Sequence, residues 1–281
     1  GRPMTAVEIS HQRLSELESS LLLKFLTEST AEINQKKIAN ATMVSYYIEH
    51  IFAELEKRTD ISSEEIARQE FAYLPVFSLR KKPLTLHRML VENPEFFMSA
   101  ICAVFKGEHE DATELTKEAE QHASAAYELL TSLNVIPGQQ GEDVDFEILK
   151  NWCVDVLKLG ESKDRHRVTA SRLGSLLAHA PLSTKDHAWP HESVRAVIEI
   201  LNSDNVEKGI ESERFNMRGV YSKSLGEGGQ QERALALQTK QWATTVSDSP
   251  RTSAMLRKIS DTWSREAERA DLSAQKDALR W

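Results

Sequence analysis

The sequence predicts an all-α protein, an irregular α-solenoid or superhelical bundle of about eleven or twelve antiparallel helices. Apolar residues recur at three- and four-residue spacing in segment after segment, which is the pattern of helices with one buried face. No stretch alternates apolar and polar residues as a strand does, and no Asn-Gly or Asp-Gly pair marks a hairpin. The loops are short and polar, so consecutive helices should run antiparallel. No fixed repeat length emerges, so a regular tetratricopeptide or HEAT array is not expected.

The first helix is predicted over roughly 10–27, where Leu14, Leu17, Leu21 and Leu22 fall on one face. Its successors are placed by the same spacing and by turn residues between them. These later helices are expected at roughly 38–58, 62–75, 84–90, 94–105, 112–133, 145–157, 163–180, 190–201, 205–225 and 230–246. A last helix is expected to begin at 250.

Several helix starts carry capping residues. Ser62, with a glutamate three residues later, forms a capping box. Asn93 and Pro94 suit the N-cap and the first helical position, and either Asp143 or Asp145 can cap a later helix. The helix after Pro94 is apolar nearly all round, so it should lie centrally in the core.

The clearest break in the helical pattern is the segment 137–141, which holds one proline and two glycines. If the chain forms two lobes, they cover residues 4–136 and 142–281. One continuous helical domain is the alternative. Residues 1–3 precede Met4 and take no part in this prediction.

Charge and cysteine content narrow the class of protein. The formal net charge is −8, so nucleic acid, which is bound through Lys and Arg, is not the expected partner. The basic runs 80–82 and 163–172 are short, and a solvated surface explains them. Cys102 and Cys153 form no paired motif, and no apolar run is long enough for a membrane span. A cytoplasmic protein without membrane attachment is expected.

No local motif for catalysis, cofactors or metal is present. The phosphate-binding loops, the zinc-binding H-E-x-x-H and the nucleophile elbow G-x-S-x-G are all missing. His187 and His191 are four residues apart, but Pro190 between them argues against one helical face. The glycines at 226, 228 and 229 follow no strand and suit a helix end. The sequence therefore predicts no catalytic residue, no cofactor and no metal site.

The densest polar feature contains five candidate partner-binding residues, which are Asn216, Arg218, Tyr221, Glu232 and Arg233. Either arginine could pair bidentately with a carboxylate. One interpretation is an internal polar network that fixes how two helices cross. The other is a recognition site for an anionic or peptide ligand. The tryptophans are expected as core anchors or interface residues, and Trp281 is the best placed to meet a partner.

A series of short signatures spans about 70 to 233. They are Glu70–Pro75, Leu86-His87, Pro94–Phe97, Trp189-Pro190, Val194-Arg195, Asn216–Val220 and Gly228–Arg233. In this order they resemble the C-terminal helical region of large multidomain bacterial proteins, some of which look like anti-phage defence proteins. The resemblance implies a helical array that senses or scaffolds, and it implies no catalytic activity for any residue.

The function expected from these observations is that of a non-catalytic helical-repeat module. Its partner would be another protein or other domains of the same polypeptide. An all-α enzyme with a site assembled around Arg218, Glu232 and Arg233 is the first alternative. A helical protein that binds nucleic acid through a basic face is the second.

Overall fold

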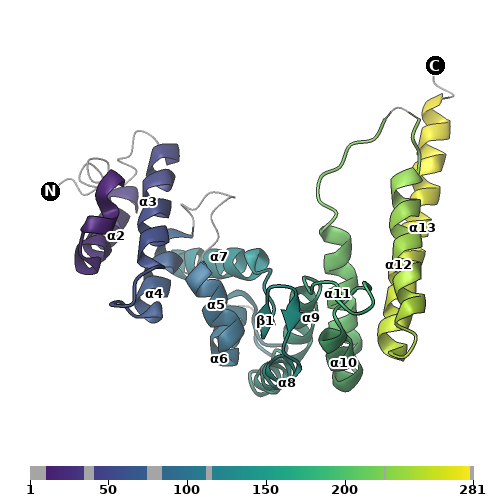
Figure 1. Ribbon diagram of the computed structural model, residues 1–281, viewed down its shortest axis with the longest axis horizontal. Coiled ribbons are helices and arrows are strands. Elements are labelled where there is room, and N and C mark those ends of the chain that lie inside the picture. Colours follow the sequence, from purple (N-terminus) through teal and green to yellow (C-terminus); the bar gives the residue numbers. More distant parts are fainter. Residues whose placement is uncertain (1–10, 35–40, 75–83, 112–115, 225, 279–281) are drawn as a thin grey trace. The chain divides into compact units, whose positions relative to one another are not determined.

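The computed structural model describes residues 11–34, 41–74, 84–111, 116–224 and 226–278 (Figure 1). Twelve α-helices, a short 3-10 helix and one two-stranded hairpin make up the described chain. The predicted all-α class is confirmed. Contacts divide the chain into two compact units. Unit 1 runs to Val104 and includes Asp111–Leu133, and unit 2 consists of Phe105–Glu110 and the chain from Asn134.

The helices of unit 1 surround an apolar core. Its elements are η1 (His11–Glu16), α2 (Ser19–Asn34), α3 (Ala41–Leu55), α4 (Ser63–Tyr73), α5 (Leu84–Glu92), α6 (Pro94–Val104) and α7 (Lys117–Ser132). Leu22, Ile51 and Phe52 are fully buried in one cluster. The hydroxyl of Tyr73 donates to the carbonyl of Leu26 at 2.5 Å, so α4 is tied to α2.

From Asn134 onward, unit 2 contains a small hairpin followed by six helices. Its elements are β1 (Gln139–Gln140), β2 (Asp143–Val144), α8 (Phe146–Ser162), α9 (His166–Leu177), α10 (Glu192–Leu201), α11 (Asp204–Asn216), α12 (Gln230–Thr245) and α13 (Pro250–Ala278). The helices α12 and α13 lie side by side (Figure 1). The helices α9 and α11 cross at Gly174 and Gly209, where a Cβ on either glycine would collide with the backbone of the other helix. Both glycines are therefore required for the close approach.

The predicted capping residues are confirmed. Ser62 accepts a hydrogen bond from the Glu65 amide at 3.2 Å, and Asn93 accepts from the first-turn amides of α6. Asp145 caps α8 by accepting from the Ile148 amide at 2.9 Å, so Asp145 fills this role and Asp143 does not. These caps satisfy amides that have no partner within the helix.

Three details of the predicted elements are wrong. The expected helix over 10–27 is split into η1 and α2, and Leu21 is exposed. The helix predicted to reach 225 ends at Asn216. The expectation of no strand is also wrong, because the predicted helix break at 137–141 leads into the β1–β2 hairpin. Gly138, just before β1, and Gly141, in the turn, have positive φ angles of 73° and 63°. A strand of two residues is too short to show alternation in the sequence.

The apolar helix α6 is less central than its composition predicts. Phe97, Met98 and Ile101 are buried, but Ser99 is exposed and Phe96 is partly exposed. The polar residues Glu95 and Ser99 are both exposed, so α6 keeps a side that faces solvent. Phe96 and Ser99 on this side of α6 line a hollow in unit 1.

Candidate functional site

The five predicted site residues lie at the connection between α11 and α12. Asn216 ends α11 and is exposed, Arg218 and Tyr221 follow in the irregular segment, and Glu232 and Arg233 lie in the first turn of α12. The structure brings Arg218, Tyr221 and Glu232 together. Asn216 has no side-chain hydrogen bond among the described residues, and Arg233 belongs to a separate ion pair.

The carboxylate of Glu232 is the centre of the network. Arg218 Nη1 lies 2.6 Å from Glu232 Oε1, and Lys223 Nζ lies 2.8 Å from Oε2. The Glu232 side chain is only 2% exposed. Burial by itself raises the pKa of this carboxyl, but the hydrogen bonds from Lys223 and Arg218 outweigh it and lower the pKa below its ordinary value. Glu232 is therefore ionised and fully paired at neutral pH.

Side chains around this pair fix the irregular segment. Gln231 accepts from Arg218 at 3.2 Å and donates to the Ser222 carbonyl at 2.9 Å. Lys223 also donates to the Gly228 carbonyl at 2.8 Å. Lys223 was not among the predicted residues, because a single lysine in a loop carries no pattern that marks it.

Arg233 is held by α13. Its guanidinium lies 2.6 Å from Asp271 Oδ2, and Asp271 Oδ1 also accepts from the Gly229 amide at 2.8 Å. A Cβ at Gly229 would collide with the backbone of Ala267. The glycines at 228 and 229 therefore let the start of α12 approach α13. Their expected role at a helix end is wrong, because α11 already ends at Asn216 and Gly229 is the N-cap of α12.

Beside the network is a cavity of about 200 Å³. Three tryptophans form its walls: Trp189, Trp242 and Trp263. The guanidinium groups of Arg214 and Arg218 also line it, together with Met217, Leu235, Gln238, Thr239 and Ile259. The lining therefore carries two cationic groups and no carboxylate.

Arg214 was not predicted and is the least compensated charge of the site. Its guanidinium lies over the Trp189 ring at 4.3 Å from the centroid, and the Met217 sulfur lies 3.9 Å from Nη1. Burial lowers the pKa of Arg214. The spacing to Arg218 gave no usable signal, because Arg218 lies beyond the end of α11 and the two residues share no helix face.

Trp189 is positioned by a loop that precedes α10. Its indole N–H donates to the Ala180 carbonyl at 2.9 Å. Arg195 donates to the carbonyls of Ala188 and Pro190 and pairs with both oxygens of Asp186. The hydrogen bond from Arg195 holds the pKa of Asp186 well below its ordinary range. This side of the cavity is therefore rigid.

A shallower hollow of about 670 Å³ adjoins the cavity along α12. Tyr221, Leu237 and Gln241 line it, and Arg218, Leu235 and Gln238 line both hollows. Tyr221 lies under the guanidinium of Arg218, whose carbon is 3.3 Å from the ring centroid. Arg218 thus separates an open apolar surface from the tryptophan-walled cavity.

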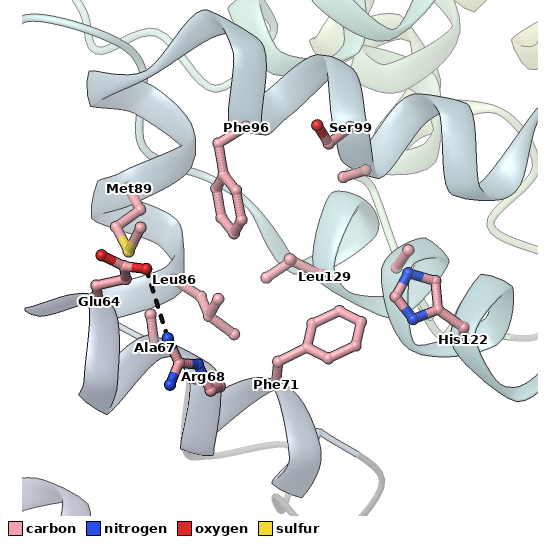
Figure 2. Close-up of a pocket in the computed structure, with 12 residues that line it drawn as sticks. Glu64, Ala67, Arg68, Phe71, Leu86, Met89, Phe96, Ser99, His122 and Leu129 are labelled. Atoms are coloured by element: carbon pink, nitrogen blue, oxygen red, sulfur yellow. Dashed lines mark hydrogen bonds and ion pairs between the residues drawn. The ribbon is translucent and has the colours of Figure 1, made fainter.

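Unit 1 contains a separate apolar hollow of about 350 Å³, shown in Figure 2. Phe71, Phe96 and Leu129 point into it, and the ion pair between Glu64 and Arg68, with an O–N distance of 3.5 Å, lies at its edge. Small residues on three helices leave this space open: Ala67, Ala100 and Ala126. An apolar group would fit this hollow, since its few polar groups lie at the margin.

Two arginines of the basic run 163–172 are engaged within unit 2. The Arg165 side chain pairs with Glu110 at 2.8 Å and donates to the Phe105 carbonyl at 2.7 Å. Arg172 lies over the Phe105 ring at 5.0 Å. These arginines hold the segment 105–110 within unit 2. The run 80–82 and Trp281 lie outside the described residues.

The remaining chemical groups of the described chain offer no reactive constellation. No three His, Cys, Asp or Glu side chains are grouped there to bind a metal ion. Burial raises the pKa of the Cys153 thiol far above its ordinary value. None of the helices in the described ranges has the length and apolar character that crossing a bilayer needs.

No protein-family model, curated protein or solved structure matches the chain.

Proposed function

We propose that this chain is a non-catalytic helical module that binds a protein partner through the surface around Arg218. We call this the Arg218 surface and define it by Arg218 and five apolar residues, Phe215, Met217, Val220, Tyr221 and Leu237. The observation that carries the proposal is their clustering. Fourteen large apolar side chains are exposed in the described chain, and these five fall within residues 215–237. Concentrated exposed apolar groups are typical of interaction sites.

The charges of the surface favour an acidic partner segment. Arg218 and Lys223 pair with the buried carboxylate of Glu232, and no carboxylate lines the cavity beside Arg214. A segment with an acidic side chain next to apolar ones would match both the cations and the open hollow along α12. The aromatic ring of Tyr221, half exposed under Arg218, suits an interface anchor.

An enzymatic role for Arg218, Glu232 and Arg233 has less support. Both oxygens of Glu232 are occupied by cations, and Arg233 is engaged by Asp271. A general base or acid needs an oxygen or proton that can reach a substrate. These ion pairs instead hold the segment between α11 and α12 in place, so we interpret the network as a support for the Arg218 surface.

The setting that we propose is a cytoplasmic, larger bacterial multidomain protein, in which this module senses or scaffolds. Support for it comes from the resemblance of the short signatures at 70–233. A specific protein recovered from infected and uninfected host cells in different amounts would connect the module to phage defence.

Site-directed cross-linking tests the proposed surface. A photo-reactive amino acid in place of Leu237, which is 59% exposed, should link to a captured partner. The same group in place of Leu182, 48% exposed and outside the hollows, is the matched control and should not. Leu237→Glu should weaken capture at least about tenfold, while Leu182→Glu should leave it unchanged. Equal cross-linking at both positions would overturn the proposal.

A further inference from the structure

The tryptophan-walled cavity beside the Arg218 surface has an unbalanced charge. Arg214 and Arg218 both line it, and no carboxylate does. Arg218 shares the Glu232 carboxylate with Lys223, so its charge is already paired. Within the described residues no carboxylate lies within 4 Å of the Arg214 guanidinium, while the nearby Glu213 faces His179 at 3.6 Å. Arg214 is partly buried, and withdrawing a guanidinium from water without a counter-ion costs free energy.

The walls of the cavity are flat and apolar. Trp189 and Trp242 lie with ring centroids 6.2 Å apart, and Trp263 is stacked on Phe215 at 4.6 Å. Such rings favour stacking against another planar group. The space of about 200 Å³ is smaller than ordinary drug-sized sites. It would hold one planar side chain or a small aromatic acid, and it would not hold a nucleotide.

The cavity is accessible from solvent, and polar side chains as well as tryptophans line it. Gln238 and Met217 at the cavity are exposed, so the site is open to solvent. Thr239 donates its hydroxyl hydrogen to the Leu235 carbonyl at 2.7 Å, and its oxygen can still accept. The Gln238 amide can donate to an anion that is already paired with an arginine.

We propose that this cavity binds a carboxylate carried on a small planar apolar group, with Arg214 and Arg218 as its counter-ions. The proposal rests on the proposed function insofar as the acidic segment of a protein partner delivers this group. A free aromatic acid has the same chemistry and is the other source. Arg214 is the specific anchor, because Arg218 is already engaged by Glu232.

Benzoate and its uncharged analogue benzamide are the probes, used on the full chain. Indole N–H resonances of the tryptophans in nitrogen-15 spectra report occupancy. Benzoate should shift the cavity resonances saturably, and benzamide should bind at least about tenfold more weakly. Equal responses to both probes, or no saturable response to benzoate, would overturn the proposal. This comparison needs no variant and so does not depend on a variant that folds.

Arg214→Gln should weaken benzoate binding about tenfold or more, after its spectrum has shown a native fold. Arg269→Gln is the matched control, because Arg269 is exposed and pairs with Glu266 one turn earlier on α13. Unchanged benzoate binding in folded Arg214→Gln would contradict the assignment. Competition then separates the two sources. Benzoate that prevents cross-linking of the partner when it is added beforehand assigns the carboxylate to that partner, and benzoate that binds without lowering the cross-linking yield assigns the site to a free acid.

Two outcomes distinguish the proposed Arg218 surface from the proposed carboxylate-binding cavity. If Leu237→Glu has no effect on capture but benzoate binds, the Arg218 surface is wrong and the anion cavity stands. If capture depends on Leu237 while benzoate does not bind and Arg214→Gln captures normally, the cavity assignment is wrong and the interaction module stands.

Discussion

The carboxylate of Glu232 carries two ion pairs while almost no solvent reaches it. Removing one partner of such a buried group leaves the others as uncompensated charges. Glu232→Gln would leave Arg218 and Lys223 partly buried without an anion. We therefore expect Glu232→Gln to lower the free energy of unfolding at pH 7 by about 3 kcal/mol, measured by urea denaturation. Glu266→Gln, at an exposed pair, should change it by less than about 0.5 kcal/mol.

The contribution of Glu232 to the free energy of unfolding should decrease at acid pH. The pKa of Glu232 is lower in the folded state, because the hydrogen bonds from Lys223 and Arg218 outweigh the opposing effect of burial. The stability it contributes is therefore present above its unfolded pKa, about 4.3, and is lost as the pH falls through the lower folded pKa. The difference between the parent and Glu232→Gln should shrink in that acid range. A difference that stays constant down to pH 2 would contradict the ion-pair explanation.

Some residues of the site could be predicted from the sequence. Arg218, Tyr221 and Glu232 were found because polar and aromatic groups cluster along the chain. The cavity beside them was not found, because Trp189, Trp242 and Trp263 are far apart in sequence and meet only in the fold. No local pattern shows that the cavity contains Arg214 without a carboxylate. The residues that line the cavity are determined by which helices pack together.

At the scale of elements, capping residues gave the most accurate boundaries. Ser62, Asn93 and Asp145 each satisfy amides locally, so the sequence alone defines these helix starts. The end of α11 at Asn216 has no such local signal. It is followed by Met217 in helical geometry and by Gly219 with a φ of 62°. The contacts that hold this end, from Arg218 to Glu232 and Gln231, involve a different helix.

The crossing of α9 and α11 makes a separate prediction. A methyl group at Gly174 would collide with the Val206 carbonyl oxygen and crowd the Gly209 Cα at 2.9 Å. Both obstacles are backbone atoms, so no side-chain rotation can relieve the contact. We expect Gly174→Ala to lower the free energy of unfolding by about 3 kcal/mol, measured by denaturant titration.

Gly141→Ala is the control for this crossing. Gly141 has a positive φ of 63° and no atom within 4 Å of an added Cβ. Alanine there should cost only the backbone term of about 1 kcal/mol. Equal losses for the two variants would show that helix contact is not what requires Gly174.

At the scale of the whole molecule, the two units have separate cores. Phe52 is fully buried in the cluster of unit 1, and Leu173 is fully buried among the helices of unit 2. The segment 105–110 follows α6 in the chain but belongs to unit 2. Its Glu108 amide donates to the Asp164 carbonyl at 2.7 Å, and its Glu110 pairs with Arg165. The boundary of cooperative unfolding should therefore follow contacts and not chain order.

Hydrogen exchange measured by mass spectrometry tests this boundary. Phe52→Ala removes a buried aromatic ring, which should cost about 3 to 5 kcal/mol. Exchange should then rise in α3, α4 and the rest of unit 1, including α7, because local unfolding follows cooperative units. The segment 105–110 should keep the protection of α8 and α9, although it lies between two parts of unit 1 in the sequence. Leu173→Ala should give the opposite pattern, with 105–110 losing protection. If 105–110 follows unit 1 in both variants, its contacts with Asp164 and Arg165 do not determine where it folds, and the division into these two units is wrong.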